Sequence, residues 1–364
     1  MKKLIAVLLC LVMAFGLFAC AGAKKATSSE LSNIDSMFKD MEASSAAFQY
    51  PTDQVGADAS APAALAAGTY KIEVFIYKFD DTFMTNYRNE IESYFKSLET
   101  DDVKFDVHTN DGNNNMATQI EQIDTAIAQG ANALIVNMVE PTSAGTVTEK
   151  AKAAGIPVIF INREPASTDA AAWDYAGKVT YVGADARQSG TIEGNIIANL
   201  PNKGDIDGDG TVRFITLVGD PGNVDAQYRS IFSIKALTDA GIPWMRLFEQ
   251  RGNWNRAEGQ ELTSNAIAQF GSKIDVIFAN NDDMALGAIE AVKAAGWKVG
   301  KDVYIVGVDA TDPARDALAA GDLTGTVLND ANGQSHTAVN AAIQALAGNP
   351  LKMYYIVDYV AVTG

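Results

Sequence analysis

The chain has 364 residues, of which 48% are hydrophobic, and its formal net charge is -17 at pH 7. This length and hydrophobic content allow one large core or two ordinary ones, which excludes a chain that is disordered throughout. A surface this acidic repels phosphate backbones, so nucleic acid is excluded as an expected partner.

The N-terminus has the layout of a secretory signal peptide. Two lysines precede an apolar run over residues 4–19, which is short for a membrane span. The tetrapeptide Leu-Phe-Ala-Cys at 17–20 resembles a bacterial lipobox, so we predict a signal peptide at residues 1–19 and lipidation of Cys20. An ordinary signal peptide cut elsewhere is the alternative. We expect an exported protein on the outer face of the cytoplasmic membrane, at the cell surface or in the periplasm, with a lipid anchor as its only membrane attachment.

Removal of the signal peptide takes two lysines and no acids, which changes the net charge from -17 to -19. Cys10 leaves with it and Cys20 is the predicted lipid site, so no cysteine is left for a disulfide. Residues 20–69 are then rich in Ala, Ser and Gly and are interrupted by Pro51 and Pro62. This composition predicts a flexible tether behind the lipidated cysteine.

From Lys71 onward, short apolar runs alternate with amphipathic stretches. Strands are predicted at 72–77, 103–107, 133–137, 157–162, 180–183, 214–218, 246–249, 276–279 and 304–308. Helical periodicity fills most of the intervals, as at Ala285, Ile289 and Val292. This alternation predicts an α/β protein with parallel sheets flanked by helices on both faces. About nine strands exceed a typical single domain, so we expect two similar lobes.

Polar and aromatic side chains follow nearly every predicted strand, where ligands bind in an open parallel sheet. They are Asp81, Phe83, Asn137, Asn223, Asp225, Arg229, Trp254, Asn281, Asp309 and Asn329. Such residues suit a sugar, because its hydroxyls both donate and accept hydrogen bonds and its ring has apolar faces that lie against aromatic rings. Taken singly, each acid or amide is more often a turn or helix cap, and each aromatic is more often core. The joint pattern is what favours a sugar.

An acidic loop precedes the strand at 214–218. Asp205, Asp207 and Asp209 alternate and are followed by Gly210, as at the start of an EF-hand calcium loop. The ninth loop position is Arg213, which cannot coordinate a cation. The loop is therefore either a calcium site or a turn in which Arg213 neutralises the acids.

Several of these blocks, in this order, resemble the periplasmic glucose/galactose-binding proteins of bacterial ABC importers. The most specific blocks are 76–84, 137–141, 205–229, 279–282, 307–310 and 325–332, within a similarity that spans residues 70–362. The resemblance implies two Rossmann-like lobes joined by three crossings of a hinge, with the sugar in the cleft between them. It implies that one lobe holds residues 70–163 and 331–352, and the other 164–330 and 353–364.

The resemblance also assigns roles by position. Hydrogen bonds to the sugar are implied for Asp81, Asn137, Asp225, Arg229, Asn281, Asp309 and Asn329, and a sandwich around its ring for Phe83 and Trp254. Asn223 stands where the family has a histidine, which leaves the choice of epimer open. A structural calcium ion is implied at Asp205, Asp207, Asp209, Thr211 and Asp275, although aspartate at 275 is shorter than the expected glutamate.

The first function hypothesis is a monomeric solute-binding lipoprotein that delivers D-galactose, D-glucose or a methyl-galactoside to an ABC permease. A binding protein for ribose or xylose, or a sugar sensor for a membrane chemoreceptor, is the alternative. A glycosidase using Asp81 and Asp309 is disfavoured, because acids among amides and arginine are expected to be ionised, whereas a general acid needs a raised pKa. A DNA-binding regulator is disfavoured, because a helix-turn-helix domain would have to precede residue 70, where the signal peptide and tether are predicted. We therefore expect a binding protein, not an enzyme.

Overall fold

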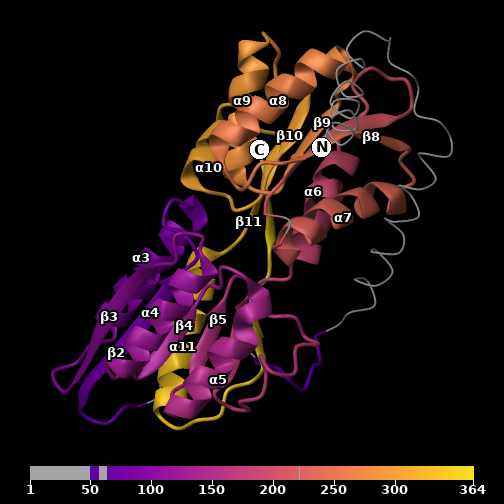
Figure 1. The fold of residues 1–364 in the computed structure, drawn as a ribbon. Helices are drawn as coiled ribbons and strands as arrows, with labels where there is room; N and C mark the ends of the chain where they lie inside the picture. Colours follow the sequence, from indigo (N-terminus) through magenta and orange to yellow (C-terminus); the bar gives the residue numbers. More distant parts are fainter. Residues whose placement is uncertain (1–49, 57–63, 221) are drawn as a thin grey trace, which may run out of the picture. The chain divides into compact units, whose positions relative to one another are not determined.

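The computed structural model describes residues 50–56, 64–220 and 222–364, which lie within one compact unit. The predicted signal peptide, Cys20 and most of the tether lie outside these residues. The fold is α/β, as predicted, with two sheets of mostly parallel strands that helices flank (Figure 1). None of the described helices is long and apolar enough to cross a membrane.

The first sheet has seven strands in the order β1-β12-β6-β5-β4-β2-β3, and every neighbouring pair is parallel. The strands are β1 (Val55–Gly56), β2 (Gly68–Ile76), β3 (Val103–Asp111), β4 (Ala133–Val136), β5 (Val158–Ile161), β6 (Val179–Gly183) and β12 (Tyr354–Ile356). Its helices are α3 (Thr82–Ser97), α4 (Met116–Ala128), α5 (Ala144–Ala154) and α11 (Ala331–Leu346), with the short η1 (Pro141–Ser143) before α5. All residues of β4 and β5 are buried, as expected for parallel strands covered on both faces.

The second sheet has six strands in the order β13-β11-β10-β9-β7-β8, of which only the β11–β13 pair is antiparallel. The strands are β7 (Val212–Val218), β8 (Trp244–Arg251), β9 (Val276–Ala279), β10 (Tyr304–Val306), β11 (Gly325–Leu328) and β13 (Val360–Thr363). Its helices are α6 (Ala186–Ala198), α7 (Val224–Asp239), α8 (Arg256–Phe270), α9 (Asp282–Ala294) and α10 (Asp312–Ala319), with η2 (Gly271–Lys273) after α8. Each sheet with its helices forms one lobe.

Three segments of the described chain connect the lobes: β6 to α6, β11 to α11, and β12 to β13. The three crossings agree with the expected hinge, but the expected lobe boundaries are wrong in two places. The resemblance implies that residues 164–183 and 353–356 belong to the second lobe, whereas β6 pairs with β5 and β12 pairs with β6 in the first sheet. The chain therefore leaves the first lobe only after Gly183, and β12 returns it to the hinge before β13.

Part of the predicted tether is folded. β1 adds a strand to the edge of the first sheet beside β12. The Tyr50 ring packs edge-on against Tyr354 with centroids 4.9 Å apart, and its hydroxyl donates to Glu164 Oε2 at 2.7 Å. Residues 50–56 thus belong to the first lobe and not to a free linker.

Candidate functional site

One pocket gathers side chains from the loops at the carboxyl ends of both sheets. Nine of the ten predicted sugar-site residues line it: Asp81, Phe83, Asn223, Asp225, Arg229, Trp254, Asn281, Asp309 and Asn329. Tyr77, Met84, Asn162 and Arg163 complete the lining. The strand-end rule therefore brings together residues that are up to about 250 positions apart in the sequence.

Asn137 is the exception among the predicted residues. It is fully buried and does not line the pocket. Its Oδ1 accepts from the Tyr77 backbone N–H at 3.2 Å, and its Nδ2 donates to Asn162 Oδ1 at 3.0 Å. Asn137 thus positions two lining residues, Tyr77 and Asn162, from the layer behind them.

Three of the lining residues also cap helices. Asp81, Asn223 and Asn281 are the N-caps of α3, α7 and α9, and each side-chain oxygen accepts a backbone N–H of the first turn. The second oxygen of Asp81 accepts from the Tyr77 hydroxyl at 2.6 Å. Helix capping and site lining are therefore combined in the same residues, because a helix that follows a strand begins at the ligand edge of the sheet.

Arg229 is a buried cation of the second lobe. Its Nη1 donates to the Asn280 carbonyl at 2.6 Å and its Nη2 to the Tyr359 hydroxyl at 3.0 Å, while Asp225 Oδ2 lies 3.8 Å from Nη2. Its Nε has no hydrogen-bond partner among the described residues. Such a held guanidinium suits recognition of ligand oxygens, because little side-chain freedom is left to lose.

Asp309 and Asn329 form a connected pair. Asn329 Nδ2 donates to Asp309 Oδ1 at 3.2 Å, and Gln334 Nε2 donates to Asn329 Oδ1 at 2.6 Å. Asp309 has a backbone φ of 121°, which residues other than glycine rarely adopt. Strain of this kind persists where the surroundings hold it and is common at ligand sites.

The two aromatic residues meet the pocket with little exposed surface. Phe83 is 8% exposed and Trp254 is 9% exposed. Gly219 allows the indole its position, since a Cβ there would come within 2.2 Å of the Trp254 ring. Phe83 belongs to the first lobe and Trp254 to the second, so the expected sandwich is geometrically consistent with a ring held between the lobes.

Arg163 is the most important residue that the sequence argument missed. Its side chain is buried, its guanidinium lies 3.8 Å from the centre of the Tyr77 ring, and Nη1 donates to the Val139 carbonyl at 2.7 Å. Nε and Nη2 have no hydrogen-bond partner in the part of the chain that is described. Asn162 is the last residue of the strand predicted at 157–162 and Arg163 directly follows it, so the strand-end rule would have found both.

Burial shifts the acids of this pocket toward their neutral forms. It raises the pKa of Asp225 to about 6, although the guanidinium groups of Arg229 and Arg163 oppose the shift. Burial also raises the pKa of Asp309 well above its usual range, against the pull of Arg229. The expectation that acids among amides and arginine are held ionised is therefore wrong for Asp309, because desolvation outweighs the nearby cations. Asp225, with a pKa of about 6, is still mostly ionised at pH 7.

Polar contacts between described residues join the lobes beside the pocket. Thr82 Oγ1 donates to Asp283 Oδ2 at 2.5 Å, and Arg163 Nη1 lies 3.5 Å from Asp220 Oδ2. Thr82 and Arg163 belong to the first lobe, and both acids belong to the second. The pocket is therefore bounded by direct polar contacts between the lobes.

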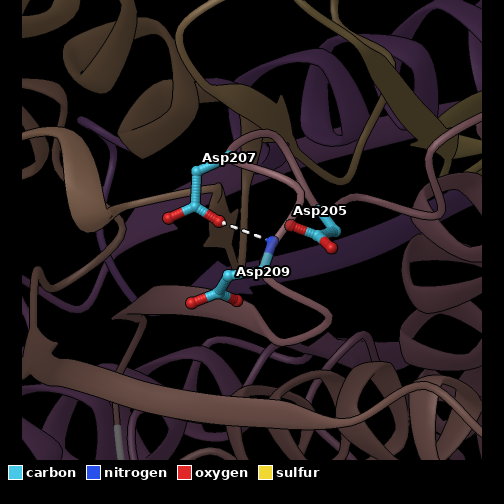
Figure 2. A group of neighbouring side chains, drawn as sticks. All are labelled: Asp205, Asp207 and Asp209. Atoms are coloured by element: carbon cyan, nitrogen blue, oxygen red, sulfur yellow. Dashed lines mark hydrogen bonds between the residues drawn. The ribbon is translucent and has the colours of Figure 1, made fainter.

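The predicted calcium loop lies at the start of β7 and is shown in Figure 2. Oxygens of Asp205, Asp207 and Asp209 gather within 4.8 Å of one another. Both oxygens of Asp275 accept backbone N–H groups of the loop, from Ile206 at 3.1 Å and from Arg213 at 2.7 Å. The Arg213 guanidinium bonds Asp207 Oδ2 and Asp209 Oδ2. Because the guanidinium uses oxygens that a cation would need, the residues do not fit the calcium ion that the resemblance implies.

Comparison with known proteins identifies the class. A family model described as periplasmic binding protein domain matches residues 72–350. The D-galactose/methyl-galactoside binding periplasmic protein of Haemophilus influenzae is 37% identical over 284 residues, covering 77% of this chain and 82% of that protein. A putative rhizopine-binding protein of Rhizobium meliloti is 34% identical over 312 residues, covering 85% and 95%.

A solved structure of similar fold belongs to the same class of protein. An ABC transporter solute binding protein from Bacillus halodurans with bound myo-inositol is 30% identical, with a TM-score of 0.70 and coverage of 82% of this chain and 95% of that one. Fold, pocket and relatives define a solute-binding protein and not an enzyme. More particularly, the chain belongs to the periplasmic binding protein family, as a sugar-binding component of an ABC transporter. Membership in this family indicates export to the periplasm.

Proposed function

We propose that the chain captures a pyranose monosaccharide, D-galactose or D-glucose, in the pocket between its lobes and presents it to an ABC permease. Asp225, Asp309 and Asn281 bond the hydroxyls, Arg229 and Arg163 donate to ring or hydroxyl oxygens, and Phe83 and Trp254 cover the ring faces. A hexose has about twelve heavy atoms, and an efficiency near 0.7 kcal/mol per atom gives a dissociation constant of about 1 μM.

The observation that carries this proposal is the set of buried polar groups that the chain itself leaves unsatisfied. Arg163 Nε and Nη2 and Arg229 Nε lack partners among the described residues, although all three atoms are buried at the pocket. Buried donors without partners cost free energy, and a ligand rich in hydroxyls removes that cost. The relative that binds D-galactose or methyl-galactoside supports the choice of sugar.

A cyclitol such as myo-inositol is the second candidate, and two residues favour it. Asn223 replaces the histidine that the galactose-binding resemblance implies, and Arg163 adds a second guanidinium to the pocket. A cyclitol has no ring oxygen and offers a hydroxyl at every carbon, which suits additional donors and amides. The relatives that bind myo-inositol and are described as rhizopine-binding support this candidate.

Calorimetric titration with D-galactose, D-glucose, myo-inositol, D-ribose and D-xylose tests the proposal. We expect saturable binding of D-galactose or D-glucose at about micromolar concentration. Tighter binding of myo-inositol would assign the pocket to the second candidate, and binding of ribose or xylose alone would contradict both. Asn223→His restores the family residue and should shift the preference toward D-galactose.

Attachment and partners complete the proposal. Cys20 carries the lipid and residues up to 49 tether the lobes to the membrane, so Cys20→Ser should release the protein from membranes in fractionated cells.

The protein acts as a monomer, which size-exclusion chromatography with light scattering tests. A chemoreceptor is a second docking partner for the sugar-bound form, and loss of taxis toward the sugar on deletion would support it.

A further inference from the structure

We propose that Arg213 is the resident cation of the acidic loop and takes the place of a calcium ion, so that the loop holds its shape without a divalent metal. The proposal concerns the loop before β7 and is independent of which sugar the pocket takes.

The inner oxygens of the loop bond the loop's own backbone. Asp205 Oδ1 and Oδ2 accept from the N–H groups of Gly208 and Gly210, both at 2.8 Å. Asp207 Oδ1 accepts from the Asp209 N–H at 3.2 Å, and Asp209 Oδ1 accepts from the Thr211 N–H at 3.0 Å. Such bonds alone are compatible with a metal ion, since each oxygen keeps a second lone pair.

The outer oxygens are different, because both go to one guanidinium. Asp207 Oδ2 accepts from Arg213 Nη1 at 3.2 Å, and Asp209 Oδ2 accepts from Nη2. The Arg213 side chain is only 18% exposed, whereas those of Asp207 and Asp209 are 41% and 40% exposed. The guanidinium therefore lies beneath the two carboxylates and provides the positive charge that three neighbouring acids require.

The backbone fixes Arg213 in that position. Its N–H donates to Asp275 Oδ2 at 2.7 Å, and its carbonyl accepts from the Asp275 N–H at 2.8 Å. Asp275 Oδ1 also accepts the Ile206 N–H at 3.1 Å. A glutamate at 275 is one methylene longer and could place its carboxylate near an ion. The shorter Asp275 carboxylate bonds only the backbone N–H groups of Ile206 and Arg213. Asp275 thus links the loop to β7 directly.

A calcium ion would have to displace the guanidinium from two charge-assisted hydrogen bonds. It would also leave Arg213 charged and largely covered without its partners, which is costly. We therefore infer that the folded protein is indifferent to calcium, and that the loop carries a cation built into its sequence.

Thermal unfolding of the wild type, Arg213→Gln and Arg246→Gln, each in chelator and in about 1 mM calcium, tests the proposal. Arg246 is the matched control, because its guanidinium also bonds a carboxylate, that of Glu249 on the same strand β8. For the wild type and for the control, the unfolding temperature of each protein should be the same in chelator and in calcium. Arg213→Gln should unfold about 2–4 °C lower than the wild type in chelator, because the guanidinium that neutralises the acids is gone. It should regain most of that loss in calcium, because the amide oxygen of glutamine can coordinate the ion.

A calcium-dependent rise in the unfolding temperature of the wild type would overturn the proposal. So would an Arg213→Gln variant that loses no stability in chelator, or one that calcium does not restore. If the variant does not fold, calorimetric titration of the wild type with calcium decides alone: saturable heat overturns the proposal, and its absence supports it.

Discussion

The loop before β7 and the helix α7 that follows β7 use the same residue types in opposite ways. Before β7, Asp205, Asp207 and Asp209 are at least partly exposed, and Arg213 and the backbone satisfy every carboxylate oxygen. After β7, Asp225 and Arg229 are buried, and Arg229 Nε has no partner among the described residues. A polar cluster whose hydrogen bonds are all made within the chain is part of the fold. A buried cluster with an unsatisfied donor is prepared for a ligand.

The largest expected effect separates the two arginines. Arg229→Met removes a ligand donor and leaves Asp225 and Asp309 buried without their main cation, so D-galactose binding should weaken by about 3–5 kcal/mol. Arg213→Met, on the other side of the same strand, should leave the dissociation constant within about twofold of wild type. Calorimetric titration of both variants measures the difference, and equal losses would show that the loop and the helix α7 do not differ as described.

Arg163→Met should weaken binding by about 1.5–3 kcal/mol, the usual worth of hydrogen bonds to a charged group. The sugar-free protein should lose less than this in stability, because two of the three buried nitrogens have no partner to lose. Titration and thermal unfolding of the same variant test the contrast. A variant that unfolds far below wild type yet binds as tightly would make Arg163 a purely structural residue.

Gly219→Ala should weaken binding by about 1–3 kcal/mol, because the added Cβ would force Trp254 out of position. Gly222→Ala is the matched control in the same loop, since the nearest atom to its added Cβ is Asp220 Oδ1 at 3.4 Å. Tryptophan fluorescence and titration report on both variants. Normal binding by Gly219→Ala would show that the ring position does not matter.

The smallest effect concerns pH. Burial raises the pKa of Asp225 to about 6, above its value in the unfolded chain, so its protonated form favours the sugar-free fold below that pH and this contribution is lost as the pH rises through 6. Sugar hydroxyls donate to the ionised carboxylate, so binding should weaken up to about tenfold between pH 7 and pH 5. Asp225→Asn should flatten this dependence. In the acidic loop, the hydrogen bond from Arg213 lowers the pKa of Asp209, so that carboxylate should stay ionised over the same range.

Much of the site followed from the sequence because of one geometric rule. The carboxyl ends of parallel strands meet at one edge, so residues after separate strands could be expected together, and nine of the ten were. Asn137 met the same rule but lies one layer behind the pocket. Distance from the strand end does not reveal which way a side chain points, and an amide bonds backbone as readily as ligand.

Other features were not accessible to local patterns. β12 has an ordinary strand sequence, and its place in the first sheet depends on its pairing with β6, about 170 positions earlier in the chain. β1 is only two residues long, and its pairing with β12 depends on residues about 300 positions away. The alternation of strands and helices and the number of strands correctly predicted two α/β lobes, but they could not decide to which lobe the hinge strands belong.

Calorimetric titration of the wild-type protein with D-galactose in the presence of a calcium chelator tests sugar capture and independence from calcium together. We expect saturable binding of one sugar per chain at about micromolar concentration, unchanged when calcium replaces the chelator. Absence of binding to D-galactose, D-glucose and myo-inositol alike, or binding that appears only with calcium, would contradict this expectation.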